Sequence, residues 1–250
     1  MKKLLSALVV AHNEEENLDQ CLTNLKFADE IVVVLDKCTD CSKEVALKYT
    51  DKIIEGSWNI EGQRRNVGLQ NCSGQWILEI DADERISPEL REEILSAIKS
   101  NTPCLFKIPI ANYIGKRYVK YGWLRSICVL ERQTIHYNGY KIYHEDKEIH
   151  PTTDLKGEVK YLKNPILHFV DKDIADMINR FNRYTTWKAR DMISKNKIKV
   201  KYFSFILRFF KAFILKKGYK EGDLGFLIAI LAGLYPIVSY LKAKDFLKNE

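Results

Sequence analysis

The 250-residue chain has few cysteines, and their placement excludes several classes of protein. Of the six cysteines, only the pair in Cys38-Thr39-Asp40-Cys41 has the spacing of a redox motif or of half a zinc knuckle. No second pair accompanies it, so a disulfide framework, a zinc site and a redox centre are all disfavoured. Reduced thiols are the expected state, as in cytoplasmic proteins generally.

Internal repeats, low-complexity tracts and a cleavable signal sequence are also missing from the sequence. Met1-Lys2-Lys3-Leu4 resembles the start of a signal, but the apolar run Leu4–Ala11 has only eight residues and leads straight into polar ones. We therefore expect the part before the basic tail to be cytoplasmic. The length suffices for one large α/β domain with an appendage.

Acidic residues are missing from residues 195–220, which carry nine basic ones. Residues 1–194 hold 28 basic and 29 acidic side chains, so the formal charge of +7 comes from the C-terminal part. Tyr202–Leu215 interleaves apolar residues with these cations, which predicts a basic amphipathic helix at an anionic membrane surface. Nucleic acid is the competing partner, but no recognition motif accompanies the basic segment, so we expect no nucleic-acid binding.

Leu224–Leu241 is an uncharged run of eighteen residues, at the lower limit for a membrane-spanning helix. Three interpretations are open. We favour a helix lying in the membrane interface. The others are a helix that spans the membrane and one that packs against the N-terminal domain or a homodimer partner.

The N-terminal part alternates strand-like and helix-like segments. The expected strands are Leu4–Val10, Glu30–Leu35, Lys52–Glu55 and Gln75–Ile80. A helix is expected after the first strand, a second one capped by Ser42, and a third over Gln63–Asn71. This alternation predicts a parallel sheet covered by helices on both faces.

Three of these strands are followed by carboxylate or amide side chains, at Asn13-Glu14, Asp36–Asp40 and Asp81-Ala82-Asp83. The carboxyl ends of parallel strands share one edge, and ligands bind at that edge in open α/β sheets. Two aspartates flanking a small residue suit a divalent cation, which can clamp a diphosphate. Acidic residues at strand ends are common, so Asp81-Ala82-Asp83 alone is weak evidence for a site. Polar groups at three strand ends that share one edge predict a site more strongly.

Five segments resemble, in order, the motifs of family 2 glycosyltransferases with the GT-A fold. They are Ala11-His12-Asn13-Glu14-Glu15, Ala28–Val34, Thr39-Asp40, Gln63-Arg64-Arg65-Asn66 and Asp81-Ala82-Asp83-Glu84. The chain is most similar to the bacterial subgroup that adds a sugar, often a β-1,4-linked glucose, to the lipopolysaccharide inner core. The likeness continues through Gly122-Trp123, Arg125, His144-Glu145, His168, Arg183-Tyr184-Thr185 and Gly218–Gly225. One departure is Lys37-Cys38, where the subgroup usually has Gly-Ser.

The resemblance implies an α/β fold of GT-A type, which binds nucleotide sugars on a mostly parallel central sheet flanked by helices. We expect a catalytic domain over residues 1–194, with a nucleotide-sugar half of about 1–100 and an acceptor half of about 101–194. A helical tail, basic and amphipathic and then apolar, follows over 195–250. The implied activity is inverting transfer of a sugar, glucose first, from a UDP-sugar to lipopolysaccharide core or another lipid-linked glycan. The resemblance also implies that the protein is located in the cytoplasm, at the inner face of the cell membrane.

The resemblance also implies roles for single residues. Asp36 would accept a hydrogen bond from the uracil imide, and Arg65 would lie near the base or the diphosphate. The residues expected to bind the donor are Ala11, His12, Asn13, Glu14, Asp36, Arg65 and Asp81. Asp83 would ligate Mn²⁺ or Mg²⁺, and His168 is either a further ligand or a packed core histidine.

Glu145 is the general base that the resemblance implies, since inversion requires one on the acceptor hydroxyl. The alternatives are Asp146, Glu131 and Glu84. A plain surface carboxylate is the competing interpretation of Glu145. The residues expected to bind the acceptor are Trp123, Arg125 and His144. Filling the core is the other role open to Trp123.

Two other functions compete with sugar transfer. A nucleotidyltransferase that makes sugar nucleotides would need a glycine-rich, basic loop after the first strand to bind a triphosphate. Here that loop is His12–Glu16, which is acidic and has no glycine. The second is a non-catalytic, membrane-bound scaffold, which would have no need of Asp36, Asp81 and Asp83.

Overall fold

The computed structural model describes residues 3–99, 102–122, 132–145 and 151–248, and the chain forms two compact units. The first unit comprises Met1–Ile110 and Glu131–His168, and the second Ala111–Leu130 and Phe169–Glu250. The domain boundary expected at residue 194 falls at the end of helix α6 (Ile174–Ser194), inside the second unit.

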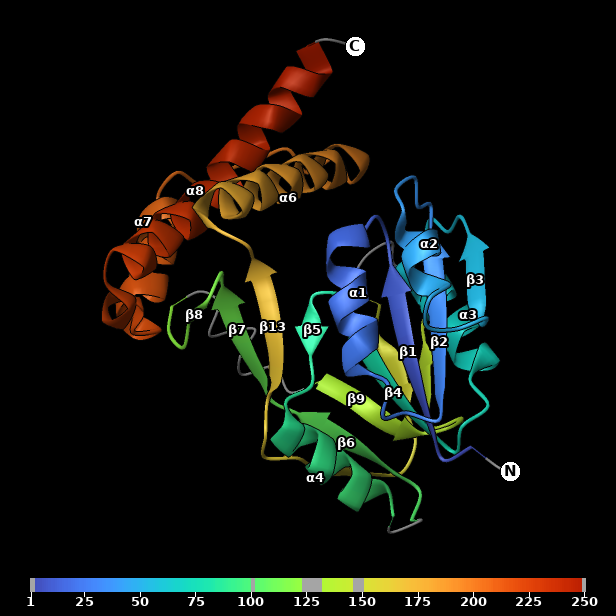
Figure 1. Ribbon diagram of the computed structural model, residues 1–250. Helices are drawn as coiled ribbons and strands as arrows, with labels where there is room; N and C mark the ends of the chain where they lie inside the picture. The colour runs from blue at the N-terminus through green and yellow to red at the C-terminus, as the bar shows by residue number, and fades with distance from the viewer. Residues whose placement is uncertain (1–2, 100–101, 123–131, 146–150, 249–250) are drawn as a thin grey trace. The chain divides into compact units, whose positions relative to one another are not determined.

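A seven-stranded, mostly parallel sheet forms the centre of the first unit (Figure 1). Its strand order is β12-β6-β9-β4-β1-β2-β3. Its strands are β1 (Leu5–Ala11), β2 (Glu30–Asp36), β3 (Ile53–Gly56), β4 (Trp76–Asp81), β6 (Cys104–Ile108), β9 (Arg132–Tyr137) and β12 (Glu158–Tyr161). Strand β9 is antiparallel to both of its neighbours. The four strands expected from the sequence are confirmed to within one residue at each end.

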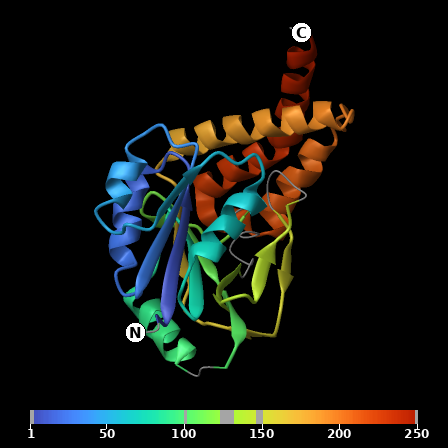
Figure 2. The same ribbon diagram turned by 90° about the vertical axis from the view of Figure 1, so that its right-hand side faces the viewer.

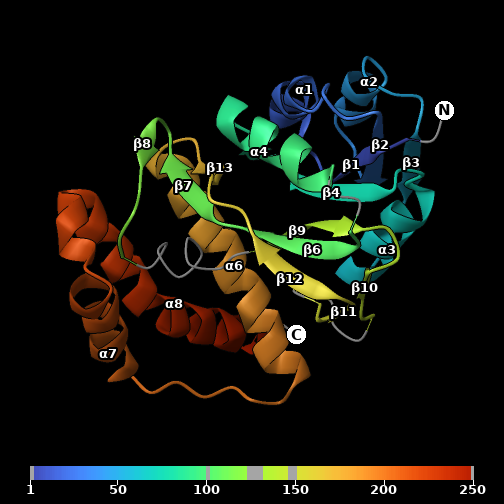
Figure 3. The same cartoon turned by 90° about the horizontal axis from the view of Figure 1, so that it is seen from below.

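Helices cover both faces of this sheet, as expected (Figure 3). The helices on one face are α1 (Glu15–Asn24), α2 (Ser42–Ala46) and α4 (Pro88–Ile98), and α3 (Glu61–Asn71) lies on the other. Leu22 and Leu90 join the larger core with Trp76, while Leu69 packs with Val34 on the α3 side. The apolar, β-branched strands are buried on both faces because both are covered.

The prediction that Ser42 caps the second helix is wrong. Ser42 is the first residue of α2, and its backbone N–H donates to Asp40 Oδ1 at 3.1 Å. The Ser42 hydroxyl instead accepts a hydrogen bond from the Glu14 backbone N–H at 3.0 Å. The side chain therefore joins the loops that follow β1 and β2, rather than closing a helix end.

Two short pairings position further segments of the first unit. Strand β5 (Glu84–Arg85) pairs antiparallel with the start of β13 (Ile166–Asp171), which sets Glu84 opposite His168. Strands β10 (Lys141–Tyr143) and β11 (Thr153–Leu155) form an antiparallel pair. The His168 segment is thereby brought to the turn that follows β4.

The second unit is mostly helical. Its remaining elements are β7 (Ile110–Ile114), which pairs with β8 (Arg117–Tyr118), α6 (Ile174–Ser194), α7 (Ser204–Phe210), a π-helical turn (Lys211–Leu215), a 3₁₀ turn (Gly218–Glu221) and α8 (Gly222–Lys248). Helix α6 (orange) lies across α8 (red) in Figure 2, and α7 also packs on α8. A Cβ on Gly225 would collide with the Gly218 carbonyl oxygen, so this close approach requires glycine.

Within the described residues, one helix, Gly218–Lys248, is long and apolar enough to cross a membrane by length and composition alone. Of its most apolar window, 39% is buried inside the protein. The buried α8 residues include Ala229 and Ala232, which pack with Ala212. Ala212 itself belongs to the tail, so these contacts do not decide among the three interpretations of Leu224–Leu241, which all stay predictions.

Candidate active site

The residues predicted to bind the donor gather at the carboxyl edge of the sheet. The strand register sets Val10 opposite Asp81 and Ala11 opposite Leu35. The ends of β1, β2 and β4 therefore lie side by side, and Asp36 is the last residue of β2. This is the edge at which ligands bind in open α/β sheets.

The loops after β1 and β2 are hydrogen-bonded to each other. His12 Nδ1 lies 2.6 Å from the Asp36 backbone oxygen. Asn13 has a left-handed φ of 53°, and its Oδ1 accepts the Thr39 backbone N–H at 2.8 Å. The turn predicted to hold uridine is thus fixed against the loop that begins with Asp36.

Asp36 is buried, and protein donors reach both of its oxygens. Oδ1 accepts the Trp58 backbone N–H at 2.9 Å, and Oδ2 accepts from Arg64 at 2.6 Å. A carboxylate oxygen has two lone pairs, so each can accept a further hydrogen bond. The contact of Asp36 with uracil stays a prediction, and Arg64 is its ion-pair partner.

Arg65 is placed between several negative groups. Its guanidinium lies 3.4 Å from Asp81 Oδ1 and 2.9 Å from Glu61 Oε1, and its carbon is 5.6 Å from the Tyr143 ring centre. Burial alone would lower the pKa of Arg65, but Asp81, Tyr143, Glu61 and Glu79 raise it well above its ordinary value. Arg65 is therefore a permanent cation beside the strand end that carries Asp81.

The two predicted metal ligands, Asp83 and His168, meet although they are far apart in the sequence. His168 Nε2 lies 3.2 Å from Asp83 Oδ2. The Asp83 side chain is 33% exposed and that of His168 is 19% exposed. One carboxylate and one imidazole suit a cation that takes its other ligands from substrate phosphates. No group of three His, Cys, Asp or Glu side chains in the described ranges could hold a metal ion.

Glu84 shapes the turn that carries Asp83. Its buried carboxylate accepts the Asp81 backbone N–H at 2.9 Å, and Arg85 donates to the Ala82 carbonyl oxygen at 2.6 Å. Glu84 was an alternative candidate for the base. Its burial inside this turn makes it a structural group rather than an acceptor-facing one.

Glu145 is exposed, and its Oε1 accepts a hydrogen bond from Asn66 Nδ2 at 3.0 Å. Its neighbour His144, predicted to bind the acceptor, has Nε2 2.8 Å from Asp154 Oδ1. Both roles stay predictions. The other predicted residues of the acceptor side, Trp123, Arg125, Glu131 and Asp146, lie outside the described residues.

A buried charge centre was missed by sequence reasoning. Glu79 on β4 lies 2.6 Å from Lys141 Nζ, 2.6 Å from the Tyr143 hydroxyl and 3.2 Å from His136 Nε2. Burial alone would raise the pKa of Glu79, but Lys141, His136 and Arg65 hold it well below its ordinary value. The signal was a glutamate inside an apolar strand, because charges are rarely buried unless they are paired.

The thiols near the site are not activated. Burial raises the pKa of Cys38, and the Glu15 carboxylate, as hydrogen-bond partner and negative charge, raises that of Cys41. Nucleophilic and metal-binding cysteines need the thiolate form. These surroundings agree with the expectation that the pair has no redox or zinc role.

Comparison with known proteins decides the class of enzyme. Residues 6–214 match the family described as glycosyl transferase family 2. The chain belongs to this family. The glycosyltransferase is 24% identical to an uncharacterized glycosyltransferase of Rickettsia prowazekii, covering 100% of this chain and 90% of the relative. It is 25% identical to the lipopolysaccharide core biosynthesis glycosyltransferase LpsC of Rhizobium meliloti, covering 95% and 91%. This confirms the expected family over a nucleotidyltransferase.

The glycosyltransferase also resembles a solved structure over nearly its whole length. A fragment of S. aureus TarS in complex with UDP-GlcNAc matches with a TM-score of 0.50 and 16% identity, covering 99% of this chain and 92% of that one. At this identity the likeness concerns the fold alone. It agrees with the expected α/β architecture of GT-A type.

Proposed function

We propose that this glycosyltransferase moves a sugar, glucose first, from a UDP-sugar to lipopolysaccharide core or another lipid-linked glycan, with inversion. The observation that carries the proposal is the arrangement after β4, where the Asp83–His168 pair adjoins Asp81 and its partner Arg65. LpsC, which is named for lipopolysaccharide core biosynthesis, and TarS, crystallised with UDP-GlcNAc, support the choice of acceptor and donor.

On the donor side, Asp83 and His168 would hold Mn²⁺ or Mg²⁺, which neutralises negative charge on a leaving diphosphate. Arg65 adds a fixed positive charge that needs no rearrangement during the reaction, because Asp81 and Glu61 already hold it. Asp36 and the loop from Ala11 to Glu14 would fix the uridine. Together these groups bind the donor and leave its anomeric carbon open to the acceptor.

On the acceptor side, Glu145 would take the proton of the attacking hydroxyl. A bond forms between that oxygen and the anomeric carbon while the bond from this carbon to the UDP oxygen breaks. UDP leaves with the electron pair, and the proton stays on the Glu145 carboxyl. Because attack and departure occur on opposite sides of one carbon, the configuration inverts and no covalent nucleophile is needed.

A panel of sugar nucleotides with Mn²⁺ tests the donor class. UDP-glucose should raise the melting temperature, since a ligand that binds only the folded state stabilises it. UDP-N-acetylglucosamine and UDP-galactose should raise the melting temperature less than UDP-glucose does. GDP-mannose is the control that should not change it. Release of UDP should depend on the metal and on an added core glycan. If GDP-mannose stabilises the protein and UDP-sugars do not, the proposed donor is wrong.

We also propose that the second unit holds the enzyme on the cytoplasmic face of the membrane. Helix α7 has no buried residue. Leu207 in this helix, and Phe203 and Leu215 on either side of it, are strongly exposed apolar residues. The cations of the same segment are Arg208, Lys211, Lys216, Lys217 and Lys220. Exposed apolar side chains next to cations are typical of a surface that binds anionic lipid.

Charge reversal of Lys211, Lys216 and Lys217 to Glu tests this surface. Each cation near an anionic leaflet contributes about 1 kcal/mol, so binding to phosphatidylserine vesicles should fall at least ~100-fold. Donor hydrolysis should not change, whereas reversal of Lys26, Lys99 and Lys163 should leave vesicle binding intact. Raising the salt from about 0.1 M to 1 M should also release wild type, because the Debye length shrinks from about 10 Å to 3 Å.

Two results would overturn the interfacial interpretation. If the charge-reversed protein stays on vesicles at high salt, Leu224–Leu241 inserts into the bilayer. If the wild-type protein does not bind vesicles, Leu224–Leu241 serves packing or dimerisation. Truncation after Ser194 is a poor substitute, because Ala189 and Met192 pack against Ala243 and would lose their cover.

A further inference from the structure

We propose that Asn66 is a positioning residue, which holds the Glu145 carboxylate where it can receive the acceptor proton. The inference rests on the proposed role of Glu145 as the general base. Asn66 belongs to helix α3, and Glu145 follows strand β10, so the contact joins two elements that are far apart in the sequence.

Among the described residues, the hydrogen bonds of the Asn66 side chain all go to one short segment. Its Oδ1 accepts the Tyr143 backbone N–H at 2.9 Å, and its Nδ2 donates to the Tyr143 carbonyl oxygen at 2.9 Å. Nδ2 also donates to Glu145 Oε1 at 3.0 Å. An amide offers two N–H donors and one carbonyl, so this geometry uses each of them. Asn66 is 7% exposed, and burial restricts it to this arrangement.

The helix is placed for this contact by its neighbouring residues. Gly62 lies one turn before Asn66 on the same face of α3, and a Cβ there would collide with the His144 carbonyl oxygen. Glycine therefore lets the helix lie against the backbone that leads to Glu145. From the other side, the Tyr143 hydroxyl donates to the buried Glu79 carboxylate at 2.6 Å. The segment that carries Glu145 is therefore held by Asn66 through the Tyr143 backbone and by Glu79 through the Tyr143 hydroxyl.

Consecutive residues of α3 thus serve both halves of the reaction. Arg65 contacts the donor-side Asp81, and Asn66 contacts the acceptor-side Glu145. Because Glu145 is exposed, its side chain would otherwise sample several rotamers. A donated hydrogen bond favours the ionised carboxylate, which is the form that accepts a proton. Loss of the Asn66 donor should loosen the base.

Asn66→Asp tests the inference, because it keeps the size and the bond to the Tyr143 N–H but replaces the donor by a second carboxylate. We expect kcat to fall about 10- to 100-fold, with the Kd for the donor unchanged. The acid limb of the kcat–pH profile should move to higher pH by about one unit, since like charges disfavour ionisation. Asn71→Asp is the matched control on the same helix, where the amide bonds to the Val67 carbonyl oxygen and neither readout should move.

A double-mutant cycle separates positioning from a purely structural role. In a Glu145→Gln background, Asn66→Asp should have little further effect on kcat, because the group that it positions has gone. An equal loss in both backgrounds would overturn the inference. If Asn66→Asp does not fold, Asn66→Ser, which lacks the amide donor, is measured in the same cycle.

The cycle also shows which proposal has failed. Absence of any sugar transfer by wild type contradicts the proposed function itself. Full activity of Glu145→Gln contradicts the assignment of the base. An active wild type, an impaired Glu145→Gln variant and an unchanged pH profile of Asn66→Asp together contradict only the role of Asn66.

Discussion

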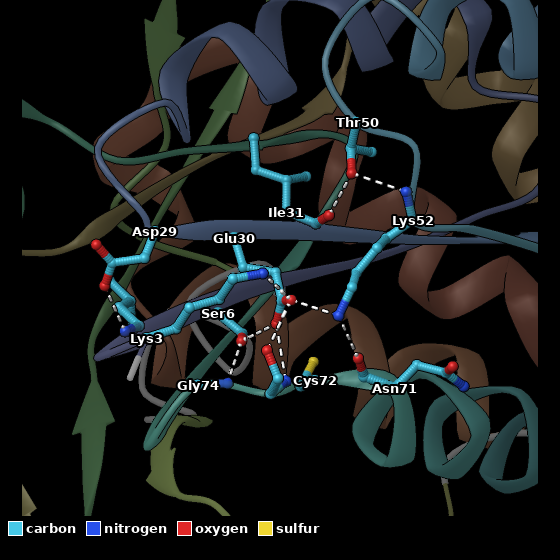
Figure 4. Close-up of polar contacts among 12 residues, drawn as sticks. Lys3, Ser6, Asp29, Glu30, Ile31, Thr50, Lys52, Asn71, Cys72 and Gly74 are labelled. Atoms are coloured by element: carbon cyan, nitrogen blue, oxygen red, sulfur yellow. Dashed lines mark hydrogen bonds and ion pairs between the residues drawn. The ribbon is translucent and has the colours of Figure 1, made fainter. Parts of the chain in front are cut away.

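Two carboxylates at opposite edges of the central sheet have opposite surroundings. Glu30 begins β2 at the amino edge, and its side chain is 2% exposed among Lys3, Lys52 and Ser6 (Figure 4). Asp83 follows β4 at the carboxyl edge and is 33% exposed. Both come from the same kind of position, a strand terminus. The difference is that the protein itself satisfies Glu30, whereas Asp83 keeps surface for a ligand.

The surroundings of Glu30 fix its charge. Burial alone would raise the pKa of Glu30, but hydrogen bonds from Lys3, Lys52, Ser6 and the Ser73 backbone lower it well below its ordinary value. Such a group holds neighbouring strands together and has little left to offer a substrate. The comparison therefore separates carboxylates that stabilise the fold from those available for chemistry, and it can be tested residue by residue.

The largest effect is expected for Asp83→Asn, which keeps the size of the side chain and removes its charge. If Asp83 ligates the metal as proposed, its loss should lower sugar transfer by about 10³-fold or more, which corresponds to about 4 kcal/mol in the activation barrier. The melting temperature should hardly change, because the side chain is partly exposed. UDP release with added Mn²⁺ measures the loss, and Glu92→Gln is the control. Full wild-type activity in EDTA would contradict the assignment.

The next largest effect is expected for Glu79→Gln, at the buried charge centre. Removing the charge of Glu79 breaks a buried ion pair with Lys141, which typically lowers the free energy of unfolding by about 3–5 kcal/mol. The Lys141 side chain is only 7% exposed, so water compensates little for the lost carboxylate charge. Urea unfolding measures the loss. A change in the free energy of unfolding below ~1 kcal/mol would mean that the ion pairs of Glu79 contribute little to stability.

Glu30→Gln should be milder, at about 1–3 kcal/mol, with unchanged sugar transfer. Its partners Lys3 and Lys52 have side chains 40% and 43% exposed, so water can solvate them after the change. The folded-state pKa of Glu30 lies below its ordinary value of 4.5. The stability that it contributes is therefore present above pH 4.5 and is lost as the pH falls through the folded-state pKa.

Unfolding of wild type and Glu30→Gln across this pH range checks the sign. The difference between the two proteins should be constant near neutral pH and should shrink in acid. A difference that grows in acid would show that Glu30 is not held in its charged form.

The smallest effect is expected at Lys37, which has a left-handed φ of 53° in the loop after β2. Its Nζ donates to the Trp58 carbonyl oxygen at 2.7 Å. Lys37→Gly and Lys37→Ala both lose this bond, but only glycine adopts the left-handed conformation without strain. The glycine variant should be more stable than the alanine variant by about 1 kcal/mol. Equal stabilities would show that the loop relaxes instead.

Local patterns in the sequence predicted the four parallel strands β1 to β4, but not the parallel pair of β6 and β12. Apolar runs with sharp polar ends located β1 to β4, because a buried strand must be apolar and a ligand-binding edge must be polar. Strand β9 was not predicted in this way, because Arg132–Tyr137 has few apolar residues. It joins the sheet by pairing with β4 and β6. Long-range pairing of that kind leaves no local signature.

The same limit applied to the candidate site. The positions of Asp36, Asp81 and Asp83 follow from strand ends, so the sequence could place them together. The contact of Asn66 with Glu145 and the burial of Glu79 depend on β10, which packs against α3 from far along the chain. The Asp83–His168 contact depends on the pairing of β5 with β13, which sequence analysis did not predict.

The place of β9 in the sheet has a consequence for the order in which the protein can fold. During synthesis the N-terminal residues emerge first, and β1 to β4 can pair as soon as they are made. Strand β4 then has one open edge until Arg132–Tyr137 has been synthesised, because β9 is the neighbour that covers it. An open apolar edge is a template for pairing with another chain. The nascent enzyme is thus exposed to aggregation during that interval, and chaperone contact would be most useful there.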